Sequence, residues 1–122
     1  MNTLAALKAL ELHDAGIISL NFHFEKEEIE IGVEMMEQVE TAEGNVQEVE
    51  KRIVLHFTGV AGLRMGEIRE GNMFSYEAEI YSGDFTELRP GLYKAGFTIL
   101  LGSGMPSWQF SFEFTEAGMR GR

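Results

Sequence analysis

Two apolar runs with a two-residue period lie close together near the start of the chain. The first, residues 17–24, reads Ile-Ile-Ser-Leu-Asn-Phe-His-Phe, and the second, residues 29–35, reads Ile-Glu-Ile-Gly-Val-Glu-Met. Alternation of this kind is typical of a β-strand that buries one face and exposes the other. Residues 25–28 between the runs are all charged and suit a hairpin loop. The chain is therefore expected to start its sheet with a β-hairpin.

The register of this hairpin is predicted from the loop, which places Phe24 opposite Ile29. A slip by one residue would turn every apolar side chain of one strand toward solvent, so one register should be strongly preferred. The same register places His23 opposite Glu30 on the polar face. The predicted apolar pairs further along the hairpin are Phe22 with Ile31, Leu20 with Val33, and Ile18 with Met35.

The rest of the chain predicts a mainly β domain with one helix. Residues 3–13 are rich in leucine and alanine and favour a short N-terminal helix. Short turns without helical crossovers indicate an antiparallel meander. We therefore expect six strands curled into a barrel-like or sandwich-like sheet; the alternative is an α+β fold, an open sheet with the helix on one face. Beyond the hairpin, the expected strands cover residues 51–58, 74–81, 93–101 and 108–114.

Several connections can also be predicted. Residues 37–50 are expected to extend two strands as a ribbon beyond the core, with a turn at 41–45, and residues 59–72 have no clear period. Residues 84–87 have the spacing of a capping box, which predicts one helical turn, and Pro90-Gly91 predicts a type II turn. At 122 residues the chain should form a single domain. Its expected parts are a helix and turn at 1–16, an antiparallel sheet at 17–117 and a frayed tail at 118–122.

The negative charge is concentrated in one stretch of the sequence. The formal net charge is −10, and residues 25–50 contain ten Glu and a single basic residue, Lys26, which leaves −1 for the remainder. Such a field disfavours nucleic acid and anionic membranes and attracts a basic protein. A solvated face that only aids solubility is the simpler interpretation. The predicted partner-binding residues are Glu28, Glu30, Glu34, Glu37, Glu40, Glu43, Glu48 and Glu50.

Cysteine is absent, no export signal is recognisable at the N-terminus, and no apolar run approaches the length of a membrane span. We therefore expect a soluble cytoplasmic protein. A homodimer formed through an exposed strand edge is also predicted, with its contact away from the glutamates.

Motifs for nucleophilic catalysis, phosphate binding or metal binding are not found, so a cofactor, a metal or enzymatic activity is not expected. His13-Asp14 and the pair His23 and His56 are weak candidates for chemistry, and a structural role is the stronger interpretation. The aromatic residues predict a packed core. If the sheet encloses a cavity, they would line a small-molecule site instead, formed by Phe57, Tyr76, Phe97 and Trp108.

The segment Leu-His-Asp-Ala-Gly-Ile-Ile-Ser-Leu at residues 12–20, followed by a hairpin of alternating Ile and Glu, resembles small bacterial all-β domains of uncharacterised or toxin-immunity type. The resemblance covers about 25 residues. It implies a non-enzymatic protein that binds and blocks a cognate toxin, and it assigns no functional residue.

Overall fold

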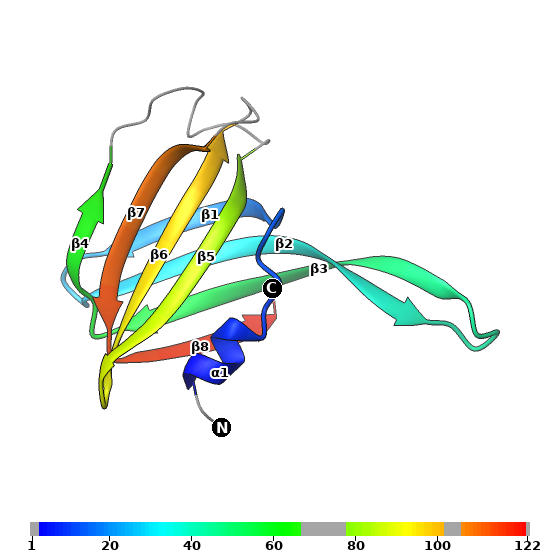
Figure 1. The fold of residues 1–122 in the computed structure, drawn as a ribbon, viewed down its shortest axis with the longest axis horizontal. Helices are drawn as coiled ribbons and strands as arrows, with labels where there is room; N and C mark the ends of the chain where they lie inside the picture. Colours follow the sequence, from blue (N-terminus) through cyan, green and yellow to red (C-terminus); the bar gives the residue numbers. More distant parts are fainter. Residues whose placement is uncertain (1–2, 67–77, 102–105, 122) are drawn as a thin grey trace.

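The computed structural model describes residues 3–66, 78–101 and 106–121, and shows one helix and a single antiparallel sheet (Figure 1). The mainly β prediction is confirmed, but the sheet has eight strands rather than six. The helix α1 covers Thr3–Lys8. The strands are β1 (Gly16–His23), β2 (Glu28–Glu40), β3 (Val46–Thr58), β4 (Ala61–Met65), β5 (Ala78–Arg89), β6 (Leu92–Leu101), β7 (Pro106–Phe114) and β8 (Glu116–Gly121).

The sheet has the strand order β4-β7-β6-β5-β1-β2-β3-β8 and is not closed, so β4 and β8 are its edges. It bends at the junction of β5 and β1, where a single pair, Gly16 with Glu79, joins the two strands. Because of this bend, the half containing β5, β6 and β7 crosses over the half containing β1, β2 and β3 (Figure 1). One antiparallel sheet is thus folded onto itself without closing into a barrel.

Aromatic side chains from the two halves meet in the core. Phe57 on β3 is fully buried, and its ring centroid lies 5.0 Å from that of Phe112 and 4.9 Å from that of Phe114, both on β7. Edge contacts of this kind add to the hydrophobic gain of burying the rings. The helix contributes Leu7, and Leu12 follows from the connection to β1. No helix in the described part of the chain is long and apolar enough to cross a membrane.

The register of the first hairpin differs from the prediction by two residues. Phe22 lies opposite Ile29 and Leu20 opposite Ile31, while Phe24 lies in the loop with 77% of its surface exposed. A shift by two keeps each side chain on its face, so the apolar pattern alone could not distinguish the two registers. The loop decides between them, because Glu27 adopts a positive φ and its N–H donates to the carbonyl of Phe24.

A bulge changes the other end of the same strand. The register shifts between Ile17 and Ser19, so Ile17 packs against the core opposite Val33. Ile18, which was predicted to face Met35 in the core, is 37% exposed. An extra residue in one strand reverses the facing of the residues beyond it, and strict alternation cannot predict this.

Both unpredicted strands lie at the edges of the sheet. β4 pairs with β7, and β8 pairs with β3 from Ile53–Gly121 to Thr58–Glu116. The prediction of a frayed tail is therefore wrong for residues 118–121, and Arg122 lies outside the described residues. Both strands are short and contain glycine, so their sequences do not indicate a strand. They form because their backbones hydrogen-bond to a neighbouring strand.

The predicted helical turn at 84–87 is wrong as well. These residues lie within β5, where Phe85 faces Ala95 of β6 and is buried in the core. Burial of the Phe85 side chain in the sheet outweighs the local preference for a helical turn that the capping-box spacing indicates. The predicted turn at Pro90-Gly91 is found between β5 and β6, and Gly91 has the positive φ of 84° that a type II turn requires at its third position.

Candidate functional site: the projecting acidic arm

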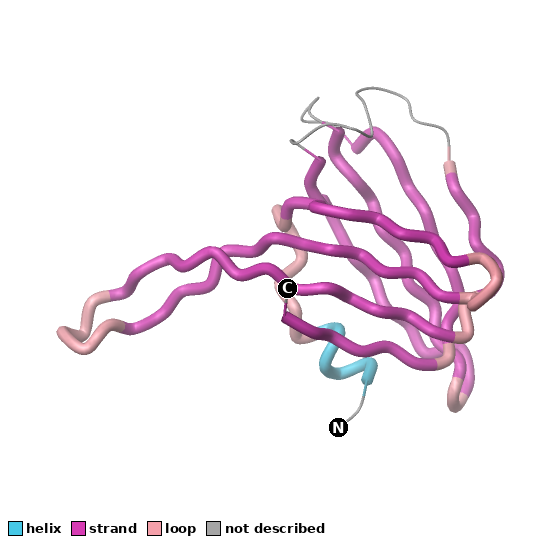
Figure 2. Tube along the Cα trace, turned by 180° about the vertical axis from the view of Figure 1, so that it is seen from behind, coloured by secondary structure: helices cyan, strands magenta, loops and turns pink. Residues whose placement is uncertain are grey.

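The strands β2 and β3 continue beyond the sheet as a two-stranded ribbon (Figures 1 and 2). The pairing of β1 with β2 ends at Glu34, and the pairing of β8 with β3 starts at Ile53. Residues 36–50, here called the arm, pair only with each other, from Met36–Glu50 to Glu40–Val46. The predicted ribbon is therefore present.

A tight loop closes the arm. The N–H of Thr41 donates to the carbonyl of Asn45 at 2.7 Å, and the N–H of Gly44 donates to the carbonyl of Thr41 at 3.0 Å. The Thr41 hydroxyl accepts a further bond from the N–H of Asn45, and Gly44 has a φ of 82°. A glycine with positive φ at this point is typical of a three-residue hairpin loop. The loop thus matches the predicted turn.

The arm is both acidic and apolar. It contains five Glu and no Lys or Arg, and each of its residues except Thr41 is exposed. Val46 is 68% exposed and Met36 60% exposed, and Val39 and Val49 are also exposed. A ribbon without a third strand and without a buried face is marginal by itself in water. The body of the sheet therefore holds this surface in place without covering it.

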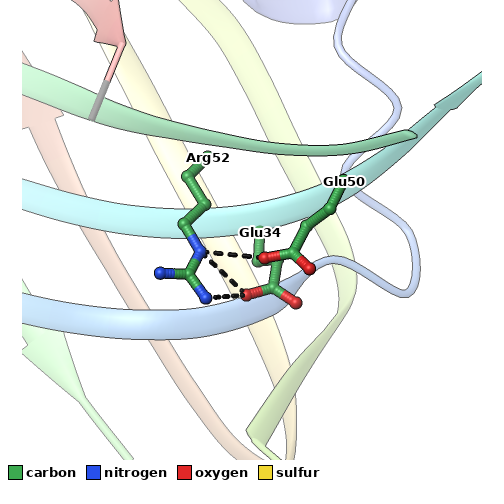
Figure 3. Close-up of polar contacts among 3 residues, drawn as sticks. All are labelled: Glu34, Glu50 and Arg52. Atoms are coloured by element: carbon green, nitrogen blue, oxygen red, sulfur yellow. Dashed lines mark hydrogen bonds and ion pairs between the residues drawn. The ribbon is translucent and has the colours of Figure 1, made fainter.

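At the root of the arm, Arg52 neutralises two glutamates (Figure 3). Its guanidinium contacts Glu34 on the neighbouring strand at 3.1 Å and Glu50 on its own strand at 3.0 Å. Cross-strand pairing places Arg52 directly opposite Glu34, so this contact follows from the register of β2 and β3. The predicted partner-binding residues Glu34 and Glu50 are therefore already paired within the chain.

Further out, internal pairing stops. The Lys51 ammonium lies 3.9 Å from a carboxylate oxygen of Glu37, a long contact between two half-exposed side chains. Within the described part of the chain, no ion pair is found for Glu40, Glu43 or Glu48. These three predicted residues carry charge that the body leaves without compensation.

The remaining predicted glutamates lie on the outer face of the body. Arg120 of β8 donates to Glu30 at 2.9 Å, and this bond, opposed by partial burial, lowers the pKa of Glu30 from its ordinary value. The charges of Arg120, His56 and His23 also act to lower this pKa. Sequence reasoning missed Arg120 because it did not predict β8.

The histidines of this face differ from the prediction in their partners. His23 lies opposite Glu28, not Glu30, as a consequence of the shifted hairpin register. The Nε2 atom of His56 is buried and lies 3.3 Å from a Glu28 oxygen, which is an ion-pair distance but not a hydrogen bond. The described residues include no group of acidic and imidazole side chains that could hold a metal ion.

His13 and Asp14 form a turn that is fixed to β5. The His13 ring contacts the Tyr81 carbonyl through Nδ1 at 2.6 Å, and the backbone N–H of Asp14 donates to the Ile80 carbonyl at 2.8 Å. Asp14 has a positive φ of 68°, which aspartate tolerates better than most residues. Both side chains are about two-thirds exposed. The arrangement supports the structural interpretation of this pair.

Three of the four aromatic residues predicted to line a ligand cavity are found in the core. Phe57, Phe97 and Trp108 are buried, and the Trp108 indole N–H donates to the Gly66 carbonyl at 2.8 Å. Phe97 also borders a surface cleft of about 390 Å³ formed with residues of β4, β5 and β7. Tyr76 lies outside the described residues. The ligand-binding hypothesis stays a prediction without a specific observation in its favour.

A comparison of the chain with protein families, curated proteins and solved structures finds no match. The functional interpretation of the arm therefore depends on the geometry and charge of the arm alone.

Proposed function

We propose that the protein is a non-catalytic protein-binding module that presents its arm to a basic partner. The observation that carries the proposal is the arm itself, which holds five carboxylates and no basic residue on an exposed ribbon. A surface of one charge sign steers an oppositely charged partner and raises its association rate.

The distribution of ion pairs supports the same function. Of the predicted glutamates, Glu30 on the body has Arg120 beside it, and Glu34 at the root of the arm has Arg52. Glutamates toward the tip have none within the described residues. Exposed valines do not aid solubility, so a ribbon that exposes both valines and carboxylates is not explained by solubility alone. Valines next to carboxylates suit a partner surface that combines apolar and basic residues. The resemblance to toxin-immunity domains is compatible with such a partner and stays a prediction.

The proposal is tested by capture of a partner with tagged protein from cell lysate, followed by identification of the captured proteins. The arm variant carries Glu40→Lys, Glu43→Lys and Glu48→Lys. The matched control carries the same change of charge at scattered, exposed positions elsewhere, Glu25→Lys, Glu87→Lys and Glu116→Lys. We expect the native protein and the control to retain a basic protein that the arm variant loses.

Retention of the same protein by the arm variant would contradict the proposal, as would its equal loss from both variants. The first result would show that the tip charges are not used, and the second that only the total charge of the molecule matters. Circular dichroism of all three proteins checks that the fold is unchanged.

A further inference from the structure

A cleft of about 440 Å³ lies where the arm leaves the body, next to the segment that follows α1. Its apolar lining includes Leu10, Met35, Met36 and Ile53. Leu10 and Met35 are partly buried and pack against the core, whereas Met36 is mostly exposed. The cleft thus joins the apolar interior to the surface of the arm.

Charged side chains also line this cleft, and they are mainly acidic. Glu11 comes from the segment after α1, Glu37 from β2, and Glu48 and Lys51 from β3. Three carboxylates and one ammonium give the lining a formal charge of −2. Lys51 is drawn toward Glu37 at 3.9 Å, while Glu11 and Glu48 have no ion pair within the described residues.

We infer that this cleft receives a lysine or arginine side chain of the basic partner. These side chains have an aliphatic stem that can lie on apolar surface while the charged head contacts carboxylates. The lining offers both parts of this environment, with Leu10, Met35 and Met36 for the stem and Glu11 and Glu48 for the head. The inference rests on the proposed function, and it names the point of the arm at which the partner is anchored.

The role of Lys51 follows from the same geometry. Lys51 lines the cleft that the incoming cation would enter, and its ammonium lies near Glu37, another lining residue. Like charges a few ångströms apart repel each other measurably even in water. Lys51 should therefore weaken the binding of a cation, and its removal should strengthen it. A cleft that recognised only apolar side chains would respond little to this change.

The test uses the whole protein and a short synthetic peptide in which leucine and lysine alternate, with its leucine–glutamate counterpart as the control ligand. Binding is followed by NMR titration of the backbone amides. We expect the lysine peptide to shift the amides of Leu10, Glu11 and Glu48, and the glutamate peptide to shift none of them. Shifts confined to the tip around Glu43, or equal shifts with both peptides, would overturn the inference.

Variants separate the charge of the cleft from the total charge of the molecule. Lys51→Ala should tighten binding of the lysine peptide about fivefold, while Lys94→Ala, the same loss of charge at an exposed position on β6, should leave it unchanged. Glu11→Lys should weaken it about tenfold. Equal effects of Lys51→Ala and Lys94→Ala would overturn the inference.

Met36→Gln tests the apolar part of the cleft, with Met119→Gln on β8 as its exposed control. Met36→Gln should weaken binding of the lysine peptide severalfold, and Met119→Gln should leave it unchanged. Equal affinities of the two variants would contradict a contact between Met36 and the aliphatic stem of the lysine side chain. If the arm variant loses its partner from lysate but Glu11→Lys retains it, the cleft is not the anchor and the proposed function stands. If both variants retain the partner, both proposals fail.

Discussion

The strands β2 and β3 contain two regions that are continuous in sequence but differ in what surrounds them. Within the body, the inward side chains Ile31, Val33 and Leu55 are almost completely buried, and the outward glutamates have basic neighbours. In the arm, the two strands pair only with each other and have no core on either side. Glu40, Glu43 and Glu48 have no ion pair within the described residues. The change occurs where the neighbouring strands β1 and β8 stop pairing.

The comparison shows that pairing between strands and burial of side chains are separable in this protein. The ladder of β2 and β3 is unbroken along its length, yet only its inner part takes part in the core. Most of the stability of a domain comes from buried surface, so the arm should contribute little to the folding of the rest.

The largest expected effect is that of a core substitution in the inner region. Phe57→Ala removes a fully buried ring that contacts Phe85, Phe112 and Phe114, and should lower the free energy of unfolding by about 3 to 5 kcal/mol. Val49→Ala on the same strand truncates a side chain that is 41% exposed in the arm, and should cost under about 0.5 kcal/mol. Urea denaturation measures both. Similar costs would contradict the division between body and arm.

The sequence was sufficient to predict much of this division. Alternation indicated which faces of the hairpin are apolar, and the glutamate-rich stretch at 37–50 indicated a ribbon beyond the core. The mainly β class with one short helix was predicted correctly. These features depend on local patterns of side chains, which the sequence contains directly.

Features that depend on distant neighbours were not predicted. The strand β8 has no alternation of its own and forms through backbone pairing with β3, so its residue Arg120 could not be assigned to Glu30. Local backbone geometry was missed as well: the bulge at Ile18 and the loop at Phe24 changed the register of β1, and the alternation of side chains does not indicate either of them. The pairing of Glu34 with Arg52 was not predicted either, although the turn at 41–45 sets the register between β2 and β3 that produces it. Alternation places both residues on strands but does not fix that register.

Breaking the ion pair between Glu30 and Arg120 on the body should have an intermediate effect on the free energy of unfolding. Arg120→Ala should lower the free energy of unfolding by about 0.2 to 1 kcal/mol at neutral pH, as is usual for a partly exposed pair. The pKa of Glu30 is lowered in the folded protein, so the pair stabilises the fold above the ordinary pKa of 4.5 and ceases to do so as the pH falls through the lowered value.

Urea denaturation of the native protein and of Arg120→Ala, repeated from neutral to acidic pH, measures this dependence. The two proteins should converge in stability at acidic pH, and Arg120→Lys, which keeps the charge, should lie between them at neutral pH. A difference in stability that stayed constant over this pH range would show that Arg120 acts through packing and not through the Glu30 carboxylate.

Removing the whole arm should also have only a small effect on stability, although fifteen residues are lost. Replacing residues 36–50 by Asn-Gly, a dipeptide that favours a tight two-residue hairpin turn, would join Met35 to Lys51, which already face each other across the ladder. The shortened protein loses no residue that is fully buried, so its free energy of unfolding should change by less than about 1 kcal/mol. Capture of the basic partner should be lost completely. A protein that failed to fold would show that the arm supports the sheet, and that its exposed charge alone does not explain why the two strands extend so far.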